Sequence, residues 1–170
     1  MAYKNGDYKN YFKVTDKVIF GFFEQFRFLS NFHNCDVLWN GYIWPSSEHA
    51  YMASKCKNVS YRETLEGSPF YDGKPIKEIL AMKSSQVKSW GQTVELREDW
   101  SNVKNNIMHS ICLDKFTRNL DLKQKLLDTG ERLLIEANSW GDSWWGFDVA
   151  KNKGENHLGK ILMDIREKVK

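Results

Sequence analysis

The chain has 170 residues, of which 41% are hydrophobic and 14% are aromatic. This composition is enough to bury a continuous core, and it predicts one globular domain over residues 1–170. The formal net charge of +3 is too small for an electrostatic footprint on DNA, and the chain has no concentrated basic run. A nucleic-acid substrate would therefore need a local basic rim.

The three cysteines, Cys35, Cys56 and Cys112, are widely separated and form no CxxC pair, which argues against a disulfide framework and a zinc site. No histidine has metal-ligand spacing with an acid or a cysteine, so we expect no metal and no redox cofactor. No apolar run approaches the ~20 residues of a membrane span, and the start of the chain lacks the apolar core of a signal peptide. We expect a cytoplasmic protein with no membrane partner, and the sequence carries no signal for an oligomeric state.

Two β-rich segments come first, Lys17 to Phe23 and Asp36 to Trp44. In the second segment, Asn40-Gly41 separates two short runs of aromatic and branched residues. An Asn-Gly pair in this position predicts a tight hairpin.

Helices dominate the rest of the chain. Periodicity and capping signals predict them over residues 46–57, 60–66, 75–82, 93–117, 121–129 and 156–169, with Gly130 closing the helix before it. Residues 133–137 indicate a short buried strand, and residues 67–75 and 138–156 indicate loops. The pattern predicts an α+β fold, a mainly helical single domain with a small N-terminal β-hairpin or sheet.

The helix predicted over residues 46–57 begins with a capping signal, because Ser46 or Ser47 can accept backbone N–H bonds of the first turn. Glu48 and Lys55 lie seven positions apart, which is about two turns, so both project from one face. One interpretation is that Glu48 complements the helix dipole and Lys55 is a solvated partner for another acid. The alternative is a functional pair in a cleft, which the neighbouring aromatic residues favour.

The loop predicted over residues 138–156 is the other candidate for function. Residues 138–148 contain three tryptophans and two acids, and long irregular loops in compact domains are usually functional or mobile. The alternative is a loop that aromatic anchors pin to the core.

Several motifs, in order and spacing, resemble the NADAR family, also called YbiA-like proteins. They are Leu29-Ser30-Asn31-Phe32, Trp44-Pro45-Ser46-Ser47-Glu48-His49, Arg97-x-Asp99-Trp100 with Lys104 and Met108, Lys115-Phe116, Leu134-Ile135-Glu136-Ala137, Asp142 with Trp145-Gly146, and Asn156-x-Leu158-Gly159-Lys160 with Leu162-Met163-x-Ile165-Arg166. The resemblance runs from about residue 20 to residue 166. Each motif is weak alone, whereas the ordered set is specific.

The resemblance implies a mainly helical YbiA-like fold with a small β component and N-glycosidase activity on ribosyl compounds. The family's activities divide between two substrates. One is the phosphoribosylated pyrimidine intermediates of riboflavin synthesis, and the other is ADP-ribose attached to guanine bases of nucleic acid. The implied partner is thus a small ribosyl phosphate or an ADP-ribosylated nucleic acid. A non-catalytic module that binds ADP-ribose or a nucleotide is the alternative.

Breaking an N-glycosidic bond passes through an oxocarbenium-like sugar, which a carboxylate stabilises. Glu48 matches the catalytic glutamate of the family, and Lys55 matches a recurrent lysine. Three roles are open to Lys55: phosphate ligand, acid for the departing base, or amine nucleophile if burial lowers its pKa.

The remaining matches imply substrate contacts. Trp100 and Trp145 would stack on the base, and Asp142, just before Trp145-Gly146, would bind the base edge or the ribose hydroxyls. Asn156 is either a cap of the last helix or a ligand contact, with capping favoured. Asn31 would hold a loop beside the cleft, and Arg27 is a candidate for the phosphate.

Two positions qualify the resemblance. Phe147-Asp148-Val149-Ala150 replaces a more glycine-rich run of the family, and a stiffer lip there would narrow the choice of substrate. His49 projects about 100° away from Glu48, so we expect a hydrogen-bonded structural histidine rather than a catalytic partner.

Overall fold

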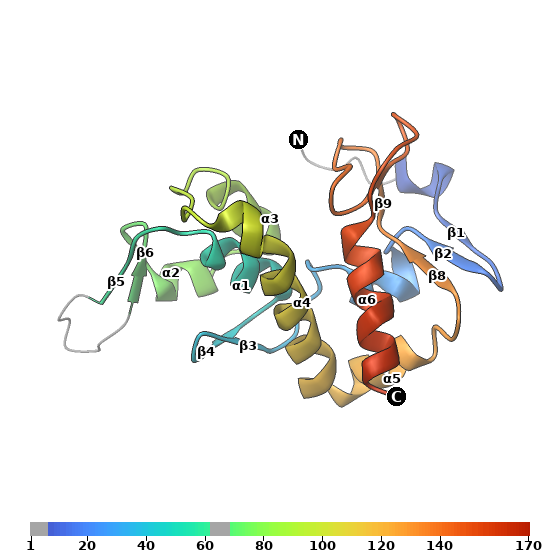
Figure 1. Cartoon of the computed structure of the whole chain (residues 1–170), viewed down its shortest axis with the longest axis horizontal. Helices are drawn as coiled ribbons and strands as arrows, with labels where there is room; N and C mark the ends of the chain where they lie inside the picture. Colours follow the sequence, from blue (N-terminus) through green and yellow to red (C-terminus); the bar gives the residue numbers. More distant parts are fainter. Residues whose placement is uncertain (1–6, 62–68) are drawn as a thin grey trace. The chain divides into compact units, whose positions relative to one another are not determined.

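The computed structural model describes residues 7–61 and 69–170 (Figure 1). The chain divides into two compact units. We call Met1–His33 with Asn119–Lys170 the terminal unit, and Asn34–Arg118 the central unit. The single domain expected over the whole chain stays a prediction.

The central unit begins with the predicted hairpin, which is confirmed. β3 (Val37–Trp39) pairs antiparallel with β4 (Tyr42–Trp44). Asn40 and Gly41 have φ values of 49° and 81°, the positive values that a type I′ turn needs. Trp44 is fully buried, and its Nε1 donates to the carbonyl of Trp39 at 3.0 Å. The hairpin thus anchors the start of the helix that follows it.

That helix, α1 (Ser47–Ser54), is buried along its whole length. It packs on α3 (Ser84–Trp90) and on α4 (Trp100–Arg118), and the three helices lie together in Figure 1. Apolar side chains that α1 and α4 bury include Ala50, Tyr51, Ala53, Ile107, Met108, Ile111, Cys112 and Phe116. The predicted helices over 46–57 and 93–117 correspond to α1 and α4.

The start of α4 was predicted too early. Residues 93–99 do not join the helix, because the chain there pairs with the segment after α1. The N–H of Lys57 donates to the carbonyl of Glu95, and the N–H of Arg97 donates to the carbonyl of Lys55, each at 2.9 Å. Tertiary pairing therefore overrides local helical periodicity.

A second sheet occupies a region where we expected a helix and a loop. β5 (Val59–Tyr61), β6 (Pro69–Tyr71) and β7 (Lys74–Pro75) pair antiparallel in that order. The helix predicted over 60–66 is wrong at residues 60 and 61, and residues 62–66 lie outside the described part of the chain. The expected loop over 67–75 contains β6 and β7. α2 (Ile76–Leu80) follows and confirms the helix predicted over 75–82.

The terminal unit joins both ends of the chain. η1 (Asp7–Asn10) precedes β1 (Lys13–Val14), and β2 (Val18–Phe20) pairs antiparallel with β1 and parallel with β8 (Leu133–Ile135). The other elements are η2 (Glu24–Leu29), α5 (Leu120–Leu127), β9 (Ala137–Asn138), β10 (Phe147–Asp148) and α6 (His157–Lys168). β9 and β10 pair in parallel within the predicted loop region. α6 packs on β8, and the fully buried side chains of this unit include Ile19, Leu134, Leu158, Leu162 and Ile165.

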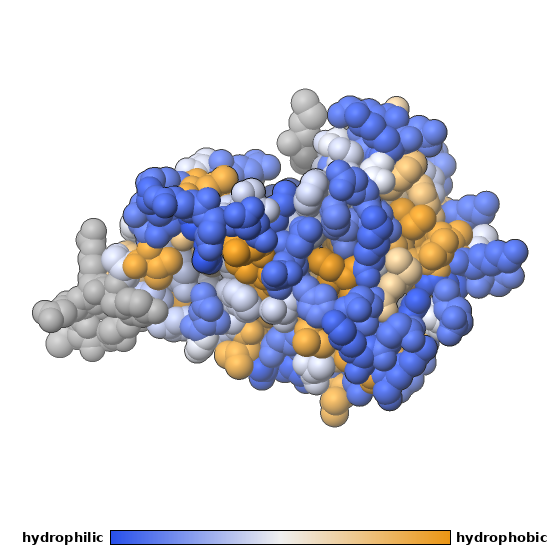
Figure 2. Space-filling view, viewed as in Figure 1, coloured by the Kyte–Doolittle hydropathy of each residue, from blue (hydrophilic) through white to orange (hydrophobic). Residues whose placement is uncertain are grey.

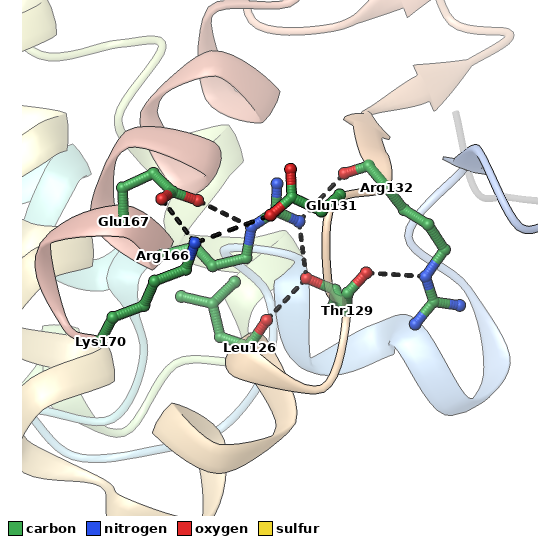
Figure 3. A network of polar contacts seen from close by, with 7 residues as sticks. All are labelled: Leu126, Thr129, Glu131, Arg132, Arg166, Glu167 and Lys170. Carbon is green, nitrogen blue, oxygen red and sulfur yellow. Dashed lines mark hydrogen bonds and ion pairs between the residues drawn. The ribbon is translucent and has the colours of Figure 1, made fainter.

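Arg166 fastens α6 to the turn after α5 (Figure 3). Only 5% of its surface is exposed, and its Nη1 donates to Thr129 Oγ1 at 2.8 Å and to the carbonyl of Arg132 at 3.0 Å. The hydroxyl of Thr129 in turn donates to the carbonyl of Leu126 at 2.6 Å. Burial lowers the pKa of Arg166. Nη1 of this desolvated guanidinium is thus bonded by neutral oxygen atoms, while its Nε has no hydrogen-bond partner and lies 3.9 Å from a carboxylate oxygen of Glu167.

The predicted fold class is confirmed: the structure is α+β, mainly helical, with small sheets. Among residues 7–61 and 69–170, no helix combines the length and the apolar character that a membrane span needs. The face seen in Figure 2 is mostly hydrophilic, with hydrophobic residues in separate patches.

Candidate active site

The first turn of α1 is held by a buried hydrogen-bond chain. The side chain of Ser46 caps the helix by accepting the N–H of His49 at 3.3 Å. The Nε2 of His49 lies 2.9 Å from the carbonyl of Met82, which only accepts, so Nε2 carries the hydrogen. His49 Nδ1 then accepts from the Ser46 hydroxyl at 2.7 Å. The predicted cap and the hydrogen-bonded role of His49 are both confirmed.

Glu48 follows the cap in the first turn and is only 5% exposed. The helix N-terminus favours a carboxylate at this position. Its charge raises the pKa of Lys55, so the two side chains lie within electrostatic reach of each other. The position of Glu48 fits the helix-dipole part of the first interpretation, whereas the half-buried Lys55 does not fit a fully solvated side chain.

Lys55 is the C-cap residue of α1 and is half-buried. Its Nζ donates to the carbonyl of Gly91 at 3.4 Å and lies 5.6 Å from the centroid of the Tyr51 ring. Burial lowers the pKa of Lys55. The charge of Glu48 opposes this effect, and the charge of Lys88 adds to it. The sequence did not show whether Lys55 is buried, and in the structure its side chain is half-buried.

Trp100 begins α4 and is half-buried. Its ring lies 5.1 Å from the ring of Tyr51 at an interplanar angle of 49°. Tyr51 therefore contacts both Trp100 and Lys55. Glu48, at the other end of α1, acts on Lys55 through its charge.

Lys88 of α3 was not among the predicted site residues. The only sequence signal was its position three residues before Gly91, and the helix that contains it was missed. Of the residues of α3, only Val87 is buried, so the segment shows no apolar periodicity.

The terminal unit contains the other predicted residues. Asn138 is fully buried and organises the loop after β9: its Nδ2 donates to the carbonyl of Asp142 at 2.7 Å. Asp142 Oδ1 accepts the N–H of Trp144 at 3.2 Å and that of Trp145 at 2.9 Å. Asp142 thus shapes the loop, and its contact with a base or ribose stays a prediction.

Gly146 is set by packing. A Cβ atom there would lie 2.2 Å from the carbonyl oxygen of Glu136 and 2.8 Å from Asn138 Nδ2. Only glycine allows this approach of the two backbones. The same position explains why the chain keeps glycine next to Trp145.

Aromatic contacts hold this loop to the start of α6. The ring of His157 lies 4.4 Å from that of Trp144 and 6.3 Å from that of Trp145. His157 Nε2 also hydrogen-bonds Glu155 at 2.8 Å. These contacts support the interpretation of the tryptophans as anchors, while the stacking of Trp145 on a base stays a prediction.

The predicted cap by Asn156 is wrong. Asn156 precedes α6 with a left-handed φ of 53°, and its side chain makes no cap bond. Its Oδ1 instead accepts the N–H of Glu136 at 3.0 Å, and its Nδ2 donates to the carbonyl of Leu134 at 2.9 Å. The carboxamide has the donor and acceptor spacing of a peptide group. It therefore bonds to the Leu134 carbonyl and to the N–H of Glu136 at the end of β8.

Arg27 lies in η2 of the terminal unit, and Asn31 follows this helix. Asn31 is 7% exposed, whereas Arg27 is exposed and its guanidinium carbon lies 5.9 Å from the Phe32 ring centroid. Their substrate roles stay predictions. Among the described residues, no group of three or more potential ligands is arranged to hold a metal ion.

The chain is similar to known proteins over most of its length. The sequence pattern of the NADAR domain matches residues 11–170. N-glycosidase YbiA of Escherichia coli is 32% identical over 142 residues, which cover 82% of this chain and 79% of that protein. An N-glycosidase of Nostoc punctiforme is 34% identical over 141 residues, with coverage of 83% and 84%. A riboflavin biosynthesis protein of Vibrio vulnificus is 34% identical over 146 residues; these are 86% of this chain but 36% of that protein's length.

The fold is also similar to a solved structure. The NMR structure of the E. coli protein YbiA superposes with a TM-score of 0.71 at 27% sequence identity, covering 92% of this chain and 87% of the other. The expectation of a YbiA-like fold is confirmed.

Proposed function

Because this chain belongs to the NADAR family, we propose that it is an N-glycosidase that hydrolyses the bond between a nitrogenous base and a ribosyl group. The observation that carries the proposal is the nearly buried carboxylate of Glu48, whose charge acts on the half-buried amine of Lys55. A module that only binds ADP-ribose or a nucleotide has no need for this pair.

The substrate we infer is a small ribosyl compound. Relatives are named N-glycosidases and a riboflavin biosynthesis protein, so a phosphoribosylated aminopyrimidine of riboflavin synthesis is the first candidate. ADP-ribose on guanine is the second. The net charge of +3 gives little support to binding of a long nucleic acid.

In this proposal Glu48 carries a proton and stabilises charge, and its burial supports both roles. A carboxylate removed from water interacts more strongly with the positive charge that develops on the sugar. It also accepts the proton of the attacking group and passes it to the departing base.

Of the three roles open to Lys55, the structure supports the amine nucleophile best. Burial and a second ammonium both lower its pKa, which increases the fraction of uncharged amine. The amine lone pair forms a bond to the anomeric carbon while the bond to the base breaks, and the base leaves with the proton that Glu48 carries. The sugar ring then opens to an imine, and water hydrolyses the imine to free amine and sugar.

Trp100 provides an aromatic face for the base in this scheme. One side of the Trp100 ring contacts Tyr51, and the Tyr51 ring also contacts Lys55 Nζ. Stacking would hold the base while the glycosidic bond breaks.

A substrate panel tests the proposal. Phosphoribosylated aminopyrimidine, guanine-linked ADP-ribose and a free ribosylamine are incubated with the protein, and the released base and sugar are identified by mass spectrometry. Glu48→Gln keeps the side-chain shape but cannot carry the charge, so we expect turnover to fall by about 10²-fold or more. Glu78→Gln, at an exposed position of α2, is the matched control.

Release of base by the wild type and loss of release in Glu48→Gln support the proposal. Tight binding of a ribosyl ligand without release of any base would instead identify a binding module. Normal turnover by folded Glu48→Gln would remove Glu48 from the mechanism.

A further inference from the structure

We propose that Asp72, in the turn between β6 and β7, is a positioning residue for Lys55. The inference rests on the proposed function, in which Lys55 supplies the reacting amine, and it adds a residue that neither the spacing nor the family motifs indicated. Asp72 acts through the backbone that holds the end of α1.

The chain that follows α1 is held by a short antiparallel ladder. The N–H of Arg97 donates to the carbonyl of Lys55, and the N–H of Lys57 donates to the carbonyl of Glu95, each at 2.9 Å. The residues between these pairs form an antiparallel bridge. Since Lys55 is the C-cap of α1, the ladder binds a carbonyl that the end of the helix leaves without an intrahelical partner.

The carboxylate of Asp72 joins both strands of this ladder. Its Oδ2 accepts the N–H of Glu95 at 2.6 Å, and its Oδ1 accepts Asn58 Nδ2 at 3.2 Å. The N–H of Asp72 also donates to the carbonyl of Asn58 at 2.8 Å. Hydrogen bonds to an ionised carboxylate are stronger than neutral ones, whereas the ion pair between Lys57 and Glu95 is exposed and contributes little. Asp72 is therefore the main side-chain tie between the strands that hold Lys55.

The position of Asp72 is itself fixed by packing. Asp72 and Gly73 have φ values of 49° and 76°, as in a type I′ turn. Tyr71, the residue before Asp72, is 4% exposed, and its ring lies 5.7 Å from the ring of the fully buried Trp44. Trp44 ends β4 just before the cap of α1. Two consecutive residues thus contact the segments before and after α1.

The consequence for catalysis lies in the placement of the Lys55 side chain. This side chain leaves the backbone at the ladder, and its Nζ reaches the carbonyl of Gly91 at 3.4 Å. A nucleophile must be held close to its attack geometry, and a displacement of about 1 Å can cost about 10²-fold in rate. If the last turn of α1 frays, Lys55 also gains contact with water, so burial lowers its pKa less. Both effects reduce attack by the uncharged amine.

The ordinary alternative is that Asp72 only favours the turn, since Asp-Gly is a common type I′ pair. Three variants separate the two roles. Asp72→Gly keeps a backbone that accepts a positive φ and removes both carboxylate bonds. Asp72→Asn keeps the turn and one acceptor oxygen. Asn40→Gly makes the corresponding exchange in the β3–β4 turn, where φ is also 49°, and is the matched control.

The first measurement is the rate of base release from a phosphoribosylated aminopyrimidine. For Asp72→Gly we expect kcat to fall about tenfold or more, with KM changed less than about twofold and the pH profile moved to higher pH. Asp72→Asn should recover part of the loss, and Asn40→Gly should keep the kcat of the wild type. If Asp72→Gly does not fold, a lower kcat in Asp72→Asn is the expected result, and wild-type kcat in that variant overturns the proposal.

A second measurement needs no turnover. NMR titration follows the pKa of Lys55, and amide hydrogen exchange follows the N–H groups of Lys57 and Arg97. In Asp72→Gly we expect faster exchange of both groups and a rise of the Lys55 pKa toward its ordinary value of 10.5. Loss of a negative charge alone would lower a lysine pKa, so a rise reports exposure to water. The other charges that act on this amine are the same in every variant, namely those of Glu48, Lys88 and Cys56.

The possible results separate the two proposals. Equal losses of stability in Asp72→Gly and Asn40→Gly, with kcat and the Lys55 pKa unchanged in both, would make Asp72 a turn residue and overturn the positioning role. If the wild type releases base but the Lys55 pKa does not respond to Asp72→Gly, the positioning role fails alone. If that pKa rises while the wild type releases no base from any substrate, the proposed function fails and the hold of Asp72 on Lys55 stands.

Discussion

The hydroxyl of Ser46 and the Nδ1 of His49 lie 2.7 Å apart in the buried first turn of α1. The other ring nitrogen donates to Met82, and in the neutral imidazole Nδ1 accepts from Ser46. Protonation would reverse the bond to Ser46, whose hydroxyl oxygen would then accept, and would place a charge in a desolvated position. The relationship makes the stability of the helix that contains Glu48 dependent on pH.

We therefore expect acid to destabilise the fold through His49. Burial lowers the pKa of His49 from 6.5, and the hydrogen bond to Met82 opposes this only in part. A lowered pKa in the folded state means that the stabilisation is present above the ordinary histidine pKa. It is lost as the pH falls through the lowered value. Urea unfolding between pH 7.5 and 4.5 measures the slope.

His49→Gln keeps a neutral amide for the Met82 carbonyl and should flatten this slope. His49→Leu leaves two buried polar groups unpaired and should cost about 1–3 kcal/mol for each at neutral pH. His109→Gln on α4 is the control. An unchanged acid slope in His49→Gln would assign the pH dependence to other groups.

The second prediction concerns the bond that Lys55 forms. Borohydride added during turnover should reduce the imine and trap a sugar adduct on Lys55, which peptide mass spectrometry locates. Lys55→Arg should abolish the adduct and the turnover, because a guanidinium stays protonated. Lys57→Arg, two residues further and exposed, should trap normally. Absence of an adduct, together with partial activity in Lys55→Arg, would assign Lys55 to a purely electrostatic role.

The third prediction compares the aromatic residues. Trp100→Ala should weaken binding of the base-bearing ligand by about 1–3 kcal/mol, the usual range for one base stacked on an aromatic ring. Trp145→Ala should do the same if its predicted stacking is correct. Trp140→Ala, which removes a ring that is 45% exposed, is the control. Lower stability with unchanged affinity in the folded fraction would make the tested tryptophan a packing residue.

The fourth prediction concerns the Arg166 network. Arg166→Met removes the donor for Thr129 and for the Arg132 carbonyl, which should cost about 1–3 kcal/mol of unfolding free energy for each buried group left unpaired. Combination with Thr129→Val should show a coupling of about 0.5–3 kcal/mol in a double-mutant cycle. Lys168→Met, exposed on the same helix, should be close to neutral. Additive effects would mean that the two side chains stabilise the fold independently.

How far the sequence alone predicts this structure depends on how local each signal is. The β3–β4 hairpin and the cap at Ser46 were predicted because an Asn-Gly turn and a helix-capping serine act within a few residues. The sheet of β5, β6 and β7 was missed, because strands of two or three residues carry little periodicity and their pairing is tertiary. The first residues assigned to α4 were wrong for the same reason: Glu95 pairs with Lys57, and Arg97 pairs with Lys55.

Candidate site residues came from the sequence where a motif indicates the chemistry. Spacing and family resemblance indicated Glu48 and Lys55, whose catalytic roles stay predictions. Lys88 lies on a polar helix with no apolar pattern, so the sequence did not indicate it. Asn156 shows the opposite case. Its position indicated a cap, but its left-handed backbone turns the carboxamide toward β8.

The double hydrogen bond between Asn156 and β8 closes the intervening segment at its base. Residues 137–155 lie between these bonded ends, and part of this segment also holds the junction. The N–H of Phe147 donates to the carbonyl of Glu136, and the N–H of Leu158 in α6 donates to the carbonyl of Trp145. Residues 139–141 are exposed, so a change of sequence there leaves the junction of β8 and α6 in place. Phe147 and Asp148 form β10, so a change at these two positions alters the junction itself.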